Sequence, residues 1–141
     1  MALIEVSQLQ KSYGAIRAVK NVSFSVDRGE VVGFLGPNGA GKSTTMKLLT
    51  GYLRPDAGTA VVAGFDVVEN PVAAKAHLGY SPEGAPAYGE MTVREFLHFA
   101  AELRGLADPA QRVADTLKLC RLEEVAGQSV DTLSKGYRMR V

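Results

Sequence analysis

The segment 31–45, VVGFLGPNGAGKSTT, constrains the fold of this chain more than any other. It opens with a short apolar run, residues 31–35, which predicts a buried parallel strand. Residues 36–43, GPNGAGKS, then fit the pattern G-x-x-x-x-G-K-[ST] at every position. From Lys42 onward the residues predict the first turn of a helix. A strand, a glycine-rich turn and a helix in this order are the context that a phosphate-binding loop requires.

The chemistry of this loop follows from its backbone. Gly36, Gly39 and Gly41 have no Cβ, so we expect positive φ angles that turn successive N–H groups toward one point, a concave nest for phosphate oxygens. The helix that begins here adds unpaired N–H groups and the positive end of its dipole. Lys42 is predicted to reach the β- and γ-phosphates, and the Ser43 hydroxyl to complete a Mg²⁺ shell of phosphate oxygens and water.

We therefore predict that the loop binds a nucleoside triphosphate, ATP before others, together with Mg²⁺. A chance glycine turn before a helix is the alternative, and the presence of all three elements favours phosphate binding. Thr44 adds a second hydroxyl, which we place beside the α-phosphate. The candidate nucleotide-binding residues of this segment are Gly36, Asn38, Gly39, Ala40, Gly41, Lys42, Ser43 and Thr44.

Composition narrows the class of protein. A chain of 141 residues, 46% of them hydrophobic, can form the core of one domain. Its formal net charge of +1 offers no support for a general nucleic-acid or membrane-surface binder, and we predict no nucleic-acid partner. The single Cys120 excludes an internal disulfide, and we predict a buried or half-buried thiol. No signal peptide follows Met1 and no apolar run approaches the ~20 residues that cross a bilayer, so a soluble chain is expected.

Hydrophobic periodicity predicts strands at residues 3–10, 18–26 and 59–63 besides the apolar run at 31–35. Within 18–26, Val22, Phe24 and Val26 alternate with the polar residues Asn21, Ser23 and Ser25, which is typical of an antiparallel strand with one face on the core. Gly51 is placed to end the helix that begins at Lys42. The first part of the chain is therefore predicted to form a mixed sheet with a parallel core.

The second part of the chain has a helical pattern. Thr92 and Glu95 match a capping box at the start of one helix, and Gly105 is placed to close it. Asp108 and Pro109 predict the start of a second helix. The expected apolar faces consist of Phe96, Leu97, Ala100 and Leu103 on the first helix and of Val113, Leu117 and Cys120 on the second. We predict a β/α core at 1–85 and a helical subdomain at 86–141.

The last residues, 133–141, read LSKGYRMRV. They resemble the signature of ABC ATPases, usually written LSGGQ and followed by a short helix that contains QR. Leu133, Ser134, Gly136 and Arg140 match, whereas Lys135, Tyr137 and Met139 depart from the consensus. The resemblance runs from about Leu3 to the last residue. It implies an α/β fold of the P-loop NTPase type, namely an ABC-type nucleotide-binding domain with a mixed sheet and a helical subdomain.

The resemblance also implies roles for residues outside the phosphate loop. Tyr13 lies at the position of the aromatic residue that stacks on adenine in this family, with an ordinary strand-end tyrosine as the alternative. Glu83 takes the place of the glutamine that reaches toward Mg²⁺ and the attacking water, and a solvated loop carboxylate is its alternative. Ser134 and Gly136 would contact the γ-phosphate of an ATP held by a second nucleotide-binding domain, because two such domains face each other head to tail.

The resemblance to this family also implies a function. The chain would be an ATP-binding subunit that couples ATP binding and hydrolysis to transport through a membrane permease. The segment around Glu83 is similar to that of the exporter-type branch. We expect such a subunit in the cytoplasm, held peripherally at the inner face of the membrane by its permease. A soluble ABC-type ATPase without a permease and a non-hydrolysing nucleotide-binding or dimerisation module stay open as alternatives.

The catalytic parts that the family carries after the signature have no counterpart before Val141. They are an apolar strand ending in aspartate and glutamate and, further on, a histidine that contacts the γ-phosphate. The resemblance therefore implies a C-terminally truncated domain. We assign no catalytic residue and expect this chain alone to bind nucleotide with little or no hydrolysis.

Overall fold

The computed structural model describes residues 2–82 and 88–141. The chain divides into two compact units, Met1–Ser81 and Pro82–Val141. Each unit contains its own cluster of buried apolar side chains. The two units are described separately below.

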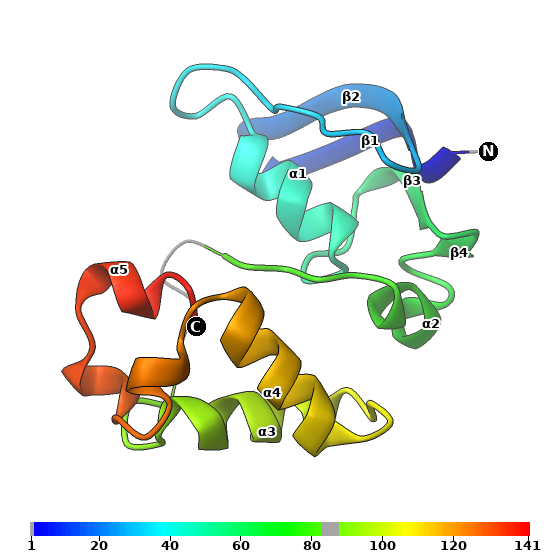
Figure 1. Cartoon of the computed structure of the whole chain (residues 1–141). Coiled ribbons are helices and arrows are strands. Elements are labelled where there is room, and N and C mark those ends of the chain that lie inside the picture. The colour runs from blue at the N-terminus through cyan, green and yellow to red at the C-terminus, as the bar shows by residue number, and fades with distance from the viewer. Residues whose placement is uncertain (1, 83–87) are drawn as a thin grey trace. The chain divides into compact units, whose positions relative to one another are not determined.

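The first unit contains a four-stranded sheet in the order β2-β1-β3-β4 (Figure 1). Its strands are β1 (Ala2–Tyr13), β2 (Ile16–Asp27), β3 (Ala57–Val62) and β4 (Phe65–Asp66). Neighbouring strands are antiparallel at all three pairings. The predicted strands at 3–10, 18–26 and 59–63 are thus confirmed, and the first two extend further than predicted because they form one long hairpin.

The hairpin of β1 and β2 turns at Gly14, whose φ is +57°, and pairs Tyr13 with Ile16 at its end. Val22, Phe24 and Val26 are half-buried, whereas the residues between them are exposed. The period-two pattern of this strand therefore predicted its buried face correctly.

The predicted strand at 31–35 is wrong. These residues have no regular secondary structure, and Figure 1 shows an irregular connection between β2 and the first helix. Val31 is fully exposed and Leu35 is 95% exposed, while the Phe34 ring lies 5.1 Å from the Phe24 ring, edge to face. A strand exists only through hydrogen bonds to a neighbour, and the sheet of the described residues pairs with no part of this segment. For the same reason the predicted parallel core is not formed there.

Helix α1 (Lys42–Leu49) begins where the glycine pattern predicts it. It ends at Gly51, with φ of +65°, whose N–H donates to Leu48 O while the N–H of Tyr52 donates to Lys47 O. This pair of bonds is the Schellman motif, which satisfies carbonyls at the end of a helix.

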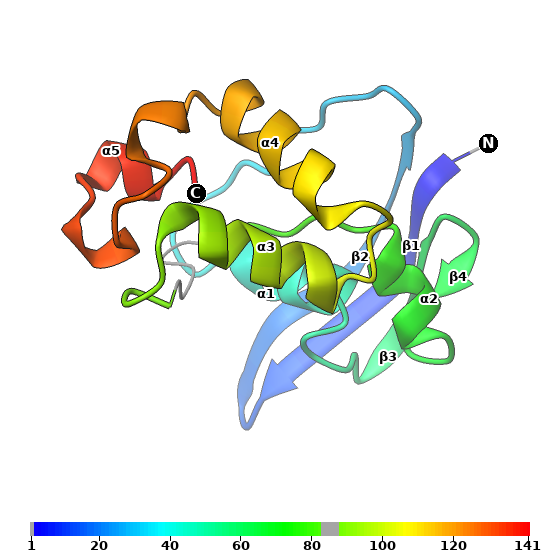
Figure 2. The same ribbon diagram turned by 60° about the horizontal axis from the view of Figure 1, so that its bottom comes forward.

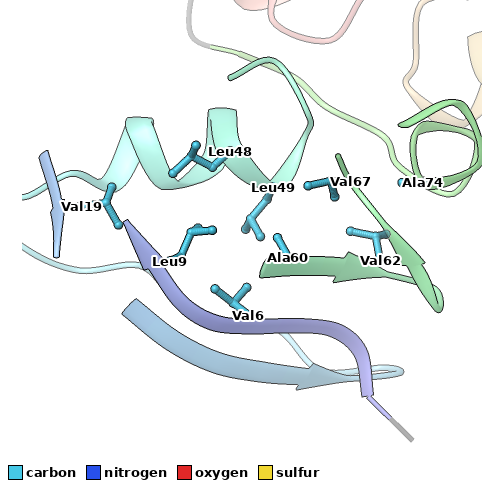
Figure 3. Packing of buried hydrophobic residues seen from close by; sticks show 9 residues of the cluster. All are labelled: Val6, Leu9, Val19, Leu48, Leu49, Ala60, Val62, Val67 and Ala74. Atoms are coloured by element: carbon cyan, nitrogen blue, oxygen red, sulfur yellow. The ribbon is translucent and has the colours of Figure 1, made fainter. Parts of the chain in front are cut away.

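The core of the first unit lies between α1 and the sheet. Figure 3 shows Leu48 and Leu49 of α1 beside Val6 and Leu9 of β1 and Ala60 of β3. Leu9 and Leu48 are completely buried. Helix α2 (Pro71–Ala76) adds Ala74 to the same cluster. Burial of this apolar face, at roughly 25 cal/mol per Å², holds α1 against the sheet and so positions the loop that precedes it.

The second unit is helical, and α3 (Val93–Leu103) and α4 (Pro109–Leu119) lie side by side (Figures 1 and 2). The capping box of α3 is confirmed: Thr92 Oγ1 accepts from the N–H of Glu95, and the Glu95 carboxylate accepts from the N–H of Thr92. Gly105 follows the end of α3 with φ of +60°, and Asp108 caps α4 by accepting from the N–H of Gln111.

The predicted apolar face of α3 is wrong at Leu103, which is 72% exposed. Val93 and Ala101 are the buried residues, and Leu97 lies between them on the same face because residues four apart share a face of a helix. Val113 and Leu117 of α4 are buried and Cys120 is half-buried, as predicted.

Two short 3₁₀ turns and a last helix complete this unit, at Glu123–Val125, Val130–Thr132 and Lys135–Arg138 (α5). The buried residues in and beside the two 3₁₀ turns pack with those of α3 and α4; they are Leu122, Val125, Ala126, Val130 and Leu133. Within the part of the chain that the structure describes, no helix is both long and apolar enough to cross a membrane.

Candidate nucleotide-binding site

The loop before α1 is built on glycines. The N–H of Ala40 donates to Pro37 O at 3.2 Å and closes a turn, and the residues in between include Gly39 with φ of +83°. Gly41 has φ of +88°. Left-handed angles at both positions are those that glycine adopts without strain, as predicted. Gly36 has a φ of +158°, so the predicted positive φ is found at all three glycines.

Gly41 also touches the sheet. A Cβ on this residue would lie 2.1 Å from the Ala18 carbonyl oxygen of β2. Only glycine permits this approach, so the end of the loop rests directly on a strand backbone. The helix that follows is consequently fixed at its first residue against the hairpin.

Lys42 turns back over the loop. Its Nζ donates to Gly36 O at 2.5 Å and to Pro37 O at 2.8 Å. An ammonium has three N–H donors, so these two bonds leave one for an acceptor beyond the loop. The positive charge is thereby held at the mouth of the glycine turn.

The hydroxyl residues after Lys42 differ in burial. Ser43 is exposed and Thr44 half-buried on the first turn of α1. Thr45 is buried, and its Oγ1 donates to Gly41 O at 2.9 Å, so this hydroxyl stabilises the loop itself. Ser43 and Thr44 have the hydroxyls that solvent or a ligand can reach.

Tyr13 lies at the end of the same hairpin that supports Gly41. Ala18 is separated from this end by the pairs Ser12–Arg17 and Tyr13–Ile16. The Tyr13 side chain is 48% exposed and Ile16 is 70% exposed. One hairpin end thus carries an accessible aromatic ring and also the carbonyl on which the phosphate loop rests.

A polar cluster that the sequence did not reveal holds this hairpin end. The Asp56 carboxylate accepts from Lys11 Nζ at 2.7 Å through Oδ1 and from the Ser12 N–H at 2.7 Å through Oδ2. Lys11 Nζ also donates to Arg54 O. The Lys11 ammonium and the Ser12 N–H lower the pKa of Asp56 below its ordinary value. No local spacing signals this contact, because Asp56 and Ser12 are 44 residues apart.

The residues present suit a metal that arrives with its nucleotide. Among the described residues no group of three or more His, Cys, Asp or Glu side chains could hold a metal ion. The accessible Ser43 hydroxyl offers one oxygen, and Mg²⁺ ordinarily takes its other ligands from phosphates and water. Glu83, the other predicted metal residue, lies outside the described residues.

The signature residues belong to the second unit. Ser134 is the N-cap of α5, and its Oγ accepts from the Tyr137 N–H at 3.3 Å. Leu133 is buried beneath it, whereas Ser134, Lys135 and Gly136 are exposed. A Cβ on Gly136 would meet only Ser134 Oγ, at 3.9 Å. The signature thus presents an open hydroxyl and an open backbone.

Comparison with known proteins gives one family. The model of the ABC transporter family matches residues 19–141. The chain is 39% identical to "Probable multidrug ABC transporter ATP-binding protein YbhF" of Escherichia coli (strain K12), over 99% of this chain and 24% of that protein. It is also 39% identical to "SkfA peptide export ATP-binding protein SkfE" of Bacillus subtilis (strain 168), over 100% of this chain and 59% of that protein.

A solved structure described as "Structure of ATP binding subunit of ABC transporter" superposes with a TM-score of 0.88. It is 35% identical in sequence, and the match covers 98% of this chain and 58% of that one. The chain therefore spans between a quarter and three fifths of the length of these relatives.

Proposed function

Because the chain belongs to the ABC transporter family, with an ABC-type P-loop fold, we propose that it binds Mg²⁺–ATP as part of a transporter's ATP-binding subunit. The relatives are longer than this chain, so the activity that their names describe applies to this chain only as a proposal. The proposal concerns the loop 36–44 and the hairpin end beside it.

The position of Lys42 is the observation that carries the proposal. Its ammonium lies over the loop carbonyls of Gly36 and Pro37, at the start of α1. The N–H groups of the first helical turn and the lysine charge act on the same point, where a phosphate oxygen would be stabilised. Asn38, Gly39 and Ala40 are exposed, and we assign their contacts with phosphate to the backbone, where the Ala40 N–H also donates to Pro37 O.

Bound Mg²⁺ would neutralise charge on the β- and γ-phosphates, with Ser43 as the protein ligand. Thr44 would contact the α-phosphate, and the exposed ring of Tyr13 would stack on the adenine. Glu83, which lies outside the described residues, is proposed to contact the metal-bound water. These roles follow from the family pattern and are compatible with the accessibility of Ser43 and Tyr13.

The signature is proposed to act on a second domain. Ser134 and Gly136 are exposed, so a partner's γ-phosphate can approach the Ser134 hydroxyl and the Gly136 backbone. Two such domains would then enclose each nucleotide between the loop of one and the signature of the other.

We propose export as the direction of transport and an integral-membrane permease as the partner. The names of the two relatives, a probable multidrug ABC transporter protein and a peptide export protein, support this direction. A subunit of this kind would lie at the cytoplasmic face of the membrane, held there by its permease.

We further propose that the 141-residue chain alone hydrolyses ATP slowly or not at all. Hydrolysis needs a group that positions or deprotonates the attacking water. The charged group of the loop, Lys42, contacts backbone carbonyls, and no carboxylate is bonded to it among the described residues.

Titration of the chain with Mg²⁺–ATP by isothermal calorimetry tests the proposed binding. Lys42→Ala is expected to weaken the affinity at least about tenfold, because a charge-assisted hydrogen bond to phosphate contributes about 1.5–3 kcal/mol. Lys47→Ala is the matched control, since Lys47 lies at the other end of α1 with its Nζ over the Tyr52 ring. Equal affinities of wild type and Lys42→Ala would refute the proposal.

Phosphate release measured on the same samples tests the proposal on hydrolysis. We expect no release above the Lys42→Ala background. Steady turnover by the wild-type chain that disappears in Lys42→Ala would contradict it and leave the binding proposal intact.

A further inference from the structure

The strand pairing that leads to the hairpin end with Tyr13 is interrupted by register shifts. The register of β1 against β2 shifts between Val6 and Leu9, between Leu9 and Lys11, and again between Lys11 and Ser12. Against β3 the register shifts between Ser7 and Gln10. Each shift interrupts the regular hydrogen bonds and bends the strand. The last two pairs, Ser12–Arg17 and Tyr13–Ile16, are regular, and a contact from outside the hairpin can add to what sets the direction of this end.

Asp56 supplies such a contact from the turn before β3. Its N–H donates to Gln10 O at 2.9 Å, and its two carboxylate oxygens accept from Lys11 Nζ and from the Ser12 N–H, each at 2.7 Å. Three consecutive residues of β1 are thereby bonded to one residue. The last of them, Ser12, is covalently joined to Tyr13.

The contacts of Asp56 are expected to affect the direction of the strand end more than the free energy of folding. The Asp56 side chain is 45% exposed and the Lys11 side chain 18% exposed. Ion pairs as exposed as this contribute little to the free energy of folding. The contacts can nevertheless fix the direction of a strand end, because a bond to the Ser12 backbone restrains the chain and not only a side chain.

We propose that Asp56 is a positioning residue for the nucleotide base: it holds the end of β1 so that the Tyr13 ring stands beside the phosphate loop. Gly41 fixes the loop to β2 at Ala18, and Asp56 fixes the adjoining part of β1, so the two ends of the nucleotide would be held by one hairpin. This inference rests on the proposed function, since it requires that the chain bind ATP and that Tyr13 contact the base.

The test compares Mg²⁺–ATP with Mg²⁺–tripolyphosphate, which has the phosphates but no base. Asp56→Ala is expected to raise the Kd for ATP about fivefold or more, the lower end of what one base–aromatic stacking contact contributes. The Kd for tripolyphosphate is expected to stay within about twofold, because the phosphate loop is unchanged. The affinity for ATP divided by the affinity for tripolyphosphate is therefore expected to fall. General destabilisation would lower both affinities and leave this ratio unchanged.

Asp66→Ala is the matched control. The Asp66 carboxylate also accepts two backbone N–H bonds, from Val68 and Glu69, and the substitution changes the net charge equally. Asp66 is on β4, which pairs with β3 away from Tyr13. Its substitution is expected to leave the ratio of the two affinities unchanged.

A double-mutant cycle with Tyr13→Ala decides whether Asp56 acts through the ring. In the Tyr13→Ala background, Asp56→Ala is expected to cause no further loss of ATP affinity. Additive losses, or an equal loss for tripolyphosphate, would overturn the inference. Should circular dichroism show that Asp56→Ala does not fold, Asp56→Asn, which keeps one of the two acceptor oxygens, is expected to show the same selective loss at smaller size, and its absence would equally overturn it.

The failure of the inference can be told apart from the failure of the proposed function. If wild type binds ATP and Lys42→Ala does not, but Tyr13→Ala or Asp56→Ala leaves the ATP affinity unchanged, the positioning role is refuted and nucleotide binding stands. If wild type binds neither ligand, both proposals fail.

Discussion

At the scale of single residues, contacts with backbone atoms determine the conformation of the phosphate loop. The Ala18 carbonyl oxygen occupies the space in which a side chain at position 41 would begin, and Lys42 Nζ takes two loop carbonyls as acceptors. Neither contact involves another side chain. The chemistry of the site therefore depends on the backbone path and on the residues that permit it.

Gly41→Ala is expected to lower the free energy of unfolding by about 2 kcal/mol or more, because a left-handed residue with a Cβ is strained by about 1–3 kcal/mol and the contact with Ala18 O adds to this. Denaturant unfolding followed by circular dichroism measures the change. Gly33→Ala is the control, since a Cβ there has no neighbour within 4 Å. Equal stabilities of the two variants would show that the loop does not rest on β2.

At the scale of elements, the helix ends could be predicted from residues a few positions apart, whereas the pairing of strands could not. The capping box of α3 joins Thr92 and Glu95, which are three residues apart and meet in any helix that begins there. The apolar run at 31–35 could form a strand only by hydrogen bonding to a neighbouring strand from elsewhere in the chain. Elements closed by short-range bonds were thus predicted correctly, whereas one of the four predicted strands, 31–35, did not form.

The capping box also predicts a dependence of stability on pH. The N–H and the hydroxyl of Thr92 donate to the Glu95 carboxylate and lower its pKa below the ordinary value. The folded-state pKa is thus below the unfolded one, about 4.3, so the stabilisation is complete at neutral pH and lost as the pH falls through the folded-state value.

Glu95→Gln removes this titration. Between about pH 5 and pH 3 its free energy of unfolding is expected to fall less steeply than that of wild type. Denaturant titrations at several pH values measure both slopes. Thr92→Ala, which loses one of the two donors, should show an intermediate slope, and identical slopes for all three proteins would contradict the assigned role of Glu95.

At the scale of the whole molecule, the described residues form two clusters of buried apolar side chains, one in each unit. Val6, Leu9 and Leu48 belong to the first cluster, and Val93 and Leu122 belong to the second. The phosphate loop and Tyr13 are carried by the first unit, and the signature by the second. A substitution in either core is therefore expected to act first on the part of the site that its own unit supports.

Leu122→Ala tests the second core. This side chain is completely buried, so its truncation is expected to cost about 2–5 kcal/mol of unfolding free energy. Leu119→Ala makes the same chemical change at a residue that is 84% exposed, and a change within about 0.5 kcal/mol is expected. Denaturant unfolding, with hydrogen exchange at the amides of the second cluster, measures both. A cost below about 1 kcal/mol for Leu122→Ala would mean that this cluster is not a packed core.

By itself the sequence determined the features whose bonds close within a few residues: the glycine turn, the start of α1 at Lys42, the caps at Thr92 and Asp108, and the alternation along β2. It also indicated the family, because the loop and the signature are short contiguous motifs. The roles assigned to Tyr13, Ser134 and Gly136 stay predictions, and Glu83 lies outside the described residues. Only the tertiary structure decided that 31–35 is unpaired, that Leu103 faces solvent, that Gly41 rests on Ala18 and that Asp56 holds the end of β1. The physical reason is that these features depend on atoms brought together from distant parts of the chain, which no local spacing encodes.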